Sequence, residues 1–179
     1  MVDFSTVTVK SNLRGWLAPG ILILLMIADF GLLSTLSLHR HDSFNSSALD
    51  LGYHDQVIWN TLQGRPFHLT LYRQDEQAPF WVDVPLDQIR DPDSLLSYHV
   101  EPLLVFIAPI YWLWDNVRAL LLLQAGVLTL GAWLAYRLGQ RRLKSPWAGL
   151  AVAIIYLLAP ARQAAALSDF HTVALTAPL

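Results

Sequence analysis

Residues 16–38 read WLAPGILILLMIADFGLLSTLSL and contain a single charged side chain, that of Asp29. At a rise of about 1.5 Å per residue, this stretch reaches about 34 Å as an α-helix, enough to cross a hydrocarbon core of roughly 30 Å. A cleavable signal peptide has a shorter apolar region, of about 7–15 residues, and a small-residue cleavage site. The stretch therefore predicts an uncleaved transmembrane helix over residues 16–38.

A second apolar region covers residues 103–138 and is interrupted by a polar cluster around Asp115. Two interpretations are open. If the region forms two spans, Arg141 and Arg142 lie outside the cell, against the positive-inside rule. If residues 103–114 form a short helix at the membrane interface, too short at about 18 Å to cross, a single span follows over residues 117–138. We favour the second interpretation because it leaves the arginines inside.

A third span is expected over residues 147–166, with a kink at Pro160, since proline removes a helix hydrogen bond. A further helix starts near Thr172, and the apolar run continues to Leu179 without a polar tail. We therefore expect residues 1–179 to be a single N-terminal part of a longer membrane domain.

Charge gives the orientation. Residues 39–99 hold nine acidic and four basic side chains, whereas residues 139–146 hold three basic and no acidic ones. With Lys10 and Arg14 keeping the N-terminus in the cytoplasm, residues 39–116 form an extracytoplasmic loop. The expected fold is an all-α, polytopic transmembrane helix bundle in the cell membrane, in contact with membrane lipids, with a large first outer loop that carries membrane-parallel helices. The net charge of −2 does not favour a nucleic-acid partner.

The outer loop is far longer than a connection between two spans requires, which points to function. Apolar residues recur at helical spacing over residues 50–65, so this segment predicts a short amphipathic helix lying on the membrane. Ser47 or Asp50 is suited to cap its start, and Gly64 to end it.

The topology brings carboxylates and imidazoles to one side of the membrane, where they are suited to act as a general base or to bind a divalent metal. They are Asp50, Asp55, His99, Glu101, Asp169 and His171.

Each of these polar residues also has a structural interpretation. Asp50 and Asp169 are equally suited to cap helices, and His99 to lie at the interface. Asp29, near mid-bilayer, is a functional candidate or faces a neighbouring helix. Arg162 either contacts a lipid phosphate or snorkels to the interface.

An ordered set of residues along the chain resembles a prokaryotic membrane-protein family filed as a domain of unknown function, number two thousand and seventy-nine. The set is Asp50-Leu51-Gly52, Gln56, Trp59-Asn60, Gly64-Arg65-Pro66, His99, Pro102, Pro109, Tyr111, Pro160 and Asp169-Phe170-His171. Tyr98 and Thr172 stand where the family commonly has acids, which counts against a metal site built from those positions.

The layout of that family is similar to that of GT-C-fold glycosyltransferases, which take a sugar from a polyprenyl-phosphate carrier at the outer face and carry an essential acid in the first outer loop. The resemblance implies that Asp50 is the catalytic base and that Gln56 and Asp169 bind substrate. It also implies that His99 or His171 positions the carrier phosphate or a metal, and that Arg162 neutralises phosphate charge.

Two other functions stay open from the sequence. In a transporter or channel subunit, Asp29 and Gln124 would line a polar path, and such sites usually lie near the midplane. In a non-catalytic membrane scaffold, the outer loop would tolerate substitution at its acidic residues.

Overall fold

The computed structural model describes residues 13–70 and 93–177, and within these ranges the chain is helical with no sheet. The expected all-α class is confirmed for this part of the chain. Lys10 and the loop acids between residues 71 and 92, on which the orientation argument partly depends, lie outside the described residues. The elements are α1 (Leu13–Asp42), α2 (Ala48–Leu62), η2 (Leu95–Ser97), α3 (Leu103–Ile107), η3 (Ala108–Trp112), α4 (Arg118–Leu143), α5 (Pro146–Leu158), α6 (Pro160–Leu167) and η4 (Thr172–Thr176).

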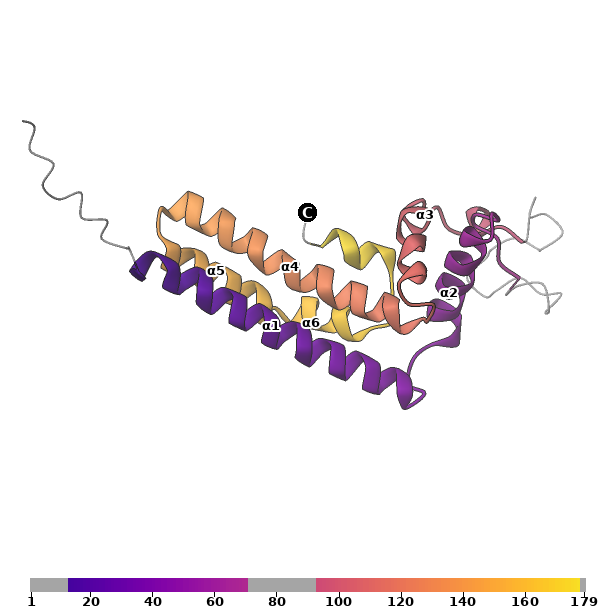
Figure 1. Cartoon of the computed structure of the whole chain (residues 1–179), viewed down its shortest axis with the longest axis horizontal. Coiled ribbons are helices and arrows are strands. Elements are labelled where there is room, and N and C mark those ends of the chain that lie inside the picture. The colour runs from indigo at the N-terminus through magenta and orange to yellow at the C-terminus, as the bar shows by residue number, and fades with distance from the viewer. Residues whose placement is uncertain (1–12, 71–92, 178–179) are drawn as a thin grey trace, which may run out of the picture.

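Three long helices, α1, α4 and α5, pack alongside one another and form a bundle (Figure 1). By length and composition, α1 from Trp16 and the whole of α4 are able to cross a membrane, and α5 together with α6 makes a third candidate span. The third is bent by 50° at its break, where Pro160 begins α6. The described residues therefore hold two or three candidate spans, and the predicted kink is confirmed.

Glycines allow α4 and α5 to approach each other closely. A Cβ atom added to Gly149 would lie 2.8 Å from the carbonyl oxygen of Tyr136, and one added to Gly139 would lie 2.9 Å from Val152. Small residues at such crossings are typical of membrane helices, whose association depends on close packing rather than on the hydrophobic effect.

The helices extend beyond the predicted spans because backbone hydrogen bonding continues past the apolar stretch into polar sequence. α1 ends at Asp42 rather than near residue 38, and α4 ends at Leu143. The turn between α4 and α5 is compact. Lys144 ends α4 in a left-handed conformation, and the Ser145 hydroxyl accepts from the Ala148 N–H at 3.4 Å to cap α5.

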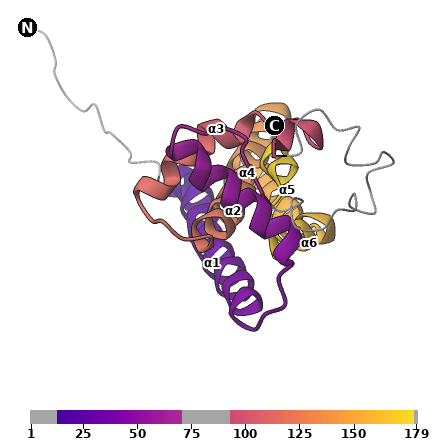
Figure 2. The ribbon, with the colours of Figure 1, turned by 90° about the vertical axis from the view of Figure 1, so that its right-hand side faces the viewer.

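The region 103–138 divides as predicted into a short apolar helical segment and one long helix. α3 and η3 together cover Leu103–Trp112, and α4 begins only at Arg118. α2 and α3 lie across one end of the bundle (Figure 2). The helix predicted from Thr172 is the short 3₁₀ helix η4, which packs beside α4.

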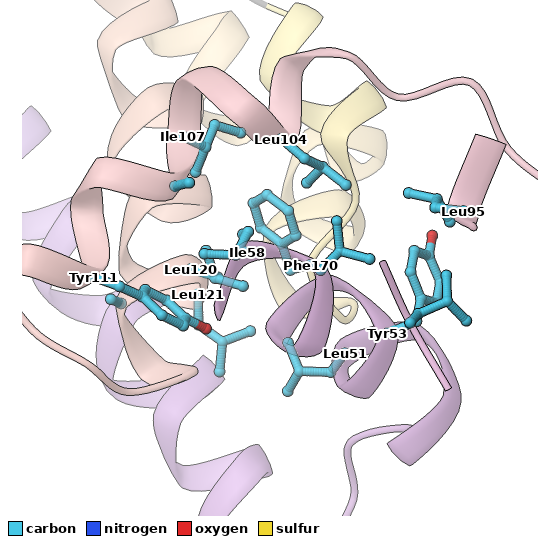
Figure 3. Packing of buried hydrophobic residues seen from close by; sticks show 14 residues of the cluster. Leu51, Tyr53, Ile58, Leu95, Leu104, Ile107, Tyr111, Leu120, Leu121 and Phe170 are labelled. Carbon is cyan, nitrogen blue, oxygen red and sulfur yellow. The ribbon is translucent and has the colours of Figure 1, made fainter. Parts of the chain in front are cut away.

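The apolar face of α2 packs on protein. Leu51, Val57 and Ile58 are buried in a cluster that includes Leu120 of α4 and Phe170, which follows α6 (Figure 3). Phe170 is fully buried at the centre of this junction. The end of the bundle therefore covers the apolar face of the helix that the sequence predicted here, and the position of α2 along the membrane stays a prediction.

Candidate functional site

The predicted site residues gather at the end of the bundle that α2 covers. Phe170 anchors the segment that contains Asp169 and His171 beneath α2. Gln124 of α4 fixes the same segment, because its amide nitrogen donates to the Asp169 carbonyl at 3.3 Å and its amide oxygen accepts from the His171 N–H at 2.9 Å. Gln124 is fully buried, and these hydrogen bonds satisfy its amide group, which explains how a polar side chain is tolerated in an apolar helix.

Asp169 holds the start of α2. Its Oδ2 atom accepts from the Ser47 N–H at 2.7 Å, and its Oδ1 atom lies 3.9 Å from the Arg40 guanidinium. The Ser47 hydroxyl accepts from the Asp50 N–H at 3.3 Å, so Ser47, not Asp50, caps the helix. A carboxylate at a helix N-terminus is favoured by the unpaired N–H groups and by the helix dipole.

The Asp50 side chain therefore has no capping role. It is partly buried in the first turn of α2. Its carboxylate forms no hydrogen bond or ion pair with any residue in the ranges 13–70 and 93–177.

One turn further along α2, a buried polar network joins three parts of the fold. The fully buried His54 ring contacts the Glu101 carboxylate, with 3.0 Å between Nε2 and Oε2. Thr172 donates to the same Oε2 atom at 2.8 Å, and Tyr53 donates to Oε1 at 3.3 Å. Glu101 thereby ties α2 to the segments that begin α3 and η4.

The geometry at His54 fixes the role of one ring nitrogen. Nδ1 lies 2.7 Å from the Asp50 carbonyl oxygen, which only accepts, so Nδ1 carries a hydrogen. The contact between Nε2 and Glu101 then holds a second proton, on the imidazole or on the carboxyl group. Burial alone would raise the pKa of Glu101, but the hydrogen bond and the positive charge of His54, with the bond from Thr172, hold that pKa below its usual value.

The two predicted histidines border this network. The His99 ring stacks on Tyr53 with 6.0 Å between centroids, and the His171 ring lies 6.1 Å from that of His54. Gln56 makes a paired contact with Thr70, donating to its hydroxyl at 2.8 Å and accepting from its N–H at 3.0 Å. Gln56 thus holds the loop after α2 against the helix.

Arg162 lies apart from these residues. It is buried and forms a two-pronged ion pair with Asp29, at 2.6 and 3.0 Å, and Thr129 also donates to Asp29 at 2.8 Å. Arg162 also donates at 2.8 Å to the carbonyl of Leu157, which the break at Pro160 leaves without a helix partner. Asp29 therefore faces a neighbouring helix, the structural interpretation considered for it.

A second carboxylate on α2 has a different environment. Tyr111 of η3 donates a short hydrogen bond to Oδ1 of Asp55. Burial raises the pKa of Asp55 and outweighs the lowering that this hydrogen bond causes, and the negative charge of Asp115 adds to the rise. Burial, followed by the bond to Asp55, raises the pKa of the Tyr111 hydroxyl as well.

The predicted residues do not assemble a metal-ligand set. Within residues 13–70 and 93–177, no group of three or more histidine, aspartate or glutamate side chains is placed to hold a metal ion. The carboxylates and imidazoles of the site are instead bonded to protein groups or separated from one another.

A family model described as "Predicted membrane protein (DUF2079)" matches residues 40–179. The chain belongs to the DUF2079 family. No curated protein and no solved structure matches the chain.

In this DUF2079 member, several contacts could not be predicted from the sequence. His54 and Glu101 were visible as polar residues of the outer loop, but no spacing rule pairs residues 47 positions apart. The same holds for Asp55 with Tyr111, and for Asp29 with Arg162, which are 133 positions apart. A charged residue in each of two apolar spans was the one available signal for the last pair.

Proposed function

We propose that this protein is an integral-membrane glycosyltransferase that takes a sugar from a polyprenyl-phosphate carrier at the outer face of the membrane. In this proposal the N-terminus is cytoplasmic, residues 39–116 are extracytoplasmic, and α2 and α3 lie along the membrane surface in a GT-C-like layout. Asp50 is the general base.

The observation that carries the proposal is the state of the Asp50 carboxylate. It is partly buried, it forms no hydrogen bond or ion pair with a described residue, and the backbone carbonyl of the same residue contacts His54 of the buried polar network. A carboxylate held in place without a partner is suited to accept a proton from a substrate hydroxyl. Ser47 and Asp169 supply the rigidity, because they fix the backbone on which Asp50 sits.

The proposed reaction is a displacement at the anomeric carbon. The acceptor hydroxyl oxygen forms a bond to that carbon as the bond from the carbon to the carrier phosphate oxygen breaks. The hydroxyl proton passes to Asp50, and the carrier leaves as polyprenyl phosphate. His99 and His171 border the network on two sides, and we assign them to contact the carrier phosphate. Gln56 and Asp169 support the site through the loop and helix start that they hold. Arg162 is bound to Asp29 and is left out of the substrate contacts.

In the transporter alternative, Asp29 and Gln124 would line a polar path. Both carboxylate oxygens of Asp29 are bonded to Arg162, and Gln124 is bonded to backbone groups. Neither group offers a free polar path, so the geometry favours the outer site. A scaffold would require that the outer acids tolerate substitution, which the following experiment measures.

The test is sugar transfer by the full-length protein in native membranes, assayed with a panel of labelled polyprenyl-phosphate sugars. Asp50→Asn keeps the shape of the side chain but removes the base, and we expect transfer to fall by a factor of about 10² to 10⁴. The matched control is Asp115→Asn, an exposed aspartate on the loop between η3 and α4. Equal rates for wild type and Asp50→Asn, or no transfer from any donor by the wild type, would reject the assignment.

A further inference from the structure

A pocket of about 640 Å³ opens where the end of α1, the start of α2 and the start of α4 meet. Its lining includes Asp42, Phe44, Ser46, Asp55 and Arg118. Asp50 does not line the pocket, but the next residue of α2, Leu51, does. Its volume is in the range of small-molecule sites, which is about 300–1,000 Å³.

Phe44 occupies the rim of this pocket in an unusual conformation. α1 ends in a Schellman motif, in which the Asn45 N–H bonds to the Arg40 carbonyl at 3.0 Å and the Phe44 N–H bonds to the His41 carbonyl at 3.0 Å. The position of Phe44 in this motif requires a left-handed residue, usually glycine, and Phe44 has φ of 58°. The residue is nevertheless 95% exposed.

Neither packing nor backbone preference accounts for a phenylalanine at this position. A large residue with positive φ is strained, and strain of this kind is concentrated at ligand-binding sites. The exposed ring gains no burial from the described chain to offset the strain. An aromatic ring held at the mouth of a pocket offers a flat apolar surface to a ligand.

The polar groups of the pocket favour a neutral, hydroxyl-rich ligand. The Arg118 guanidinium donates to Asp42 from Nε at 3.1 Å and from Nη2 at 2.7 Å, so these two charges balance. A phosphate group entering here would meet Arg118 already engaged, with the carboxylates of Asp42 and Asp55 nearby. Asp55 has one oxygen bonded to Tyr111 and a second, Oδ2, as an acceptor for a ligand hydroxyl.

We propose that this pocket binds a sugar ring, which stacks on Phe44 and hydrogen-bonds to Asp55, as the subsite for the saccharide acceptor. The assignment as an acceptor subsite rests on the proposed function, but the binding itself does not. The sugar comes either from a free saccharide or from the headgroup of a glycolipid, since the pocket lies beside the last turn of α1 and the first turn of α4.

The test measures binding of radiolabelled octyl β-D-glycosides, below their micelle concentration, to the full-length protein in phosphatidylcholine nanodiscs. The panel holds the glucoside, galactoside, mannoside and N-acetylglucosaminide, with octyl glycerol as the competitor that lacks a sugar ring. Phe44→Gly relieves the backbone strain, so the variant should fold at least as stably as wild type and bind at least tenfold more weakly. Phe44→Trp keeps an aromatic ring and should bind within about threefold of wild type. The control Phe106→Ala, at an exposed phenylalanine of α3, should bind as wild type does.

The outcomes separate the sources of the sugar. Competition by the methyl glycoside as well as the octyl glycoside identifies a free saccharide, and competition by the octyl glycoside alone identifies a glycolipid headgroup. Equal affinity in Phe44→Gly and wild type, equal competition by octyl glycerol, or no displaceable binding of any of the four glycosides would overturn the inference. A wild type that binds a glycoside but transfers no sugar would keep the pocket and reject the proposed function.

Discussion

Replacing Arg162 with methionine tests the ion pair that joins α1 to α6. The substitution removes both guanidinium bonds to Asp29, at 2.6 and 3.0 Å, and leaves the carboxylate with the Thr129 hydroxyl alone. The exposed fractions of the Arg162 and Asp29 side chains are 4% and 13%, so water does not replace the lost partner. Breaking a buried pair in this way costs about 3–5 kcal/mol. The variant also loses the bond from Arg162 to the Leu157 carbonyl, which then keeps only Gln163 at 3.3 Å.

We therefore expect Arg162→Met to lower the free energy of unfolding by about 3 kcal/mol or more, roughly a hundredfold in the folding equilibrium. The double variant Asp29→Leu with Arg162→Met removes both charges and should recover most of that loss, since apolar replacements of buried pairs are often neutral. Unfolding of the full-length protein in mixed micelles measures both. A loss near 0.6 kcal/mol, about the value of an average interhelical hydrogen bond in a membrane, would refute the reasoning. So would a double variant no more stable than the single one.

Three further predictions concern the two carboxylates beneath α2 and the orientation of the bundle. The folded-state pKa of Asp55 is raised, so the ionisation of this carboxyl lowers the stability of the fold as pH rises above the unfolded pKa of 3.8. The amide oxygen that Asp55→Asn introduces still accepts from Tyr111 but carries no charge. This variant should therefore be more stable than wild type at pH 7 and equally stable below about pH 4. The folded-state pKa of Glu101 is lowered, so its ionised carboxylate stabilises the fold above the unfolded pKa of 4.5, and this stabilisation is lost as pH falls through the folded pKa. Glu101→Gln should therefore be less stable than wild type at pH 7 and lose less stability as the solution is acidified. Thermal unfolding of both proteins across a range of pH measures this. Residues 1–179 contain no cysteine, so Ser43→Cys and Leu143→Cys each add one labelling site to this part of the chain, at opposite ends of the bundle. An impermeant maleimide added to intact cells should label the first and not the second above the labelling of the unsubstituted protein, and the reverse pattern would invert the orientation.

The positions of the spans could be predicted because the hydropathy that marks a span is a property of consecutive residues. The apolar run in α1, the separation of α3 from α4 near Asp115 and the bend at Pro160 all depend on residues adjacent in the chain. The residues that cover the apolar face of α2 could not be predicted, for the converse reason. Its apolar stripe is the same whether lipid or protein covers it, and the covering residue Phe170 lies over a hundred positions away.

For the candidate site too, the general location could be predicted from the sequence, whereas the individual contacts could not. The sequence placed Asp50, His99, Asp169 and His171 at one end of the bundle through topology alone, and the structure brings them to the same junction. It did not distinguish the capping role of Ser47 from that of Asp50, because both residue types favour helix starts and only the 3.3 Å contact decides between them. The pairing of Asp29 with Arg162 required the tertiary fold.

The rate of sugar transfer by Asp50→Asn, relative to wild type in the same membranes and with the same labelled polyprenyl-phosphate donor, tests the central claim most directly. We predict that the wild type transfers sugar and that Asp50→Asn retains no more than about one per cent of its rate, with equal amounts of inserted protein. Equal rates for the two proteins would contradict the account, because the carboxylate of Asp50 would then have no part in the chemistry.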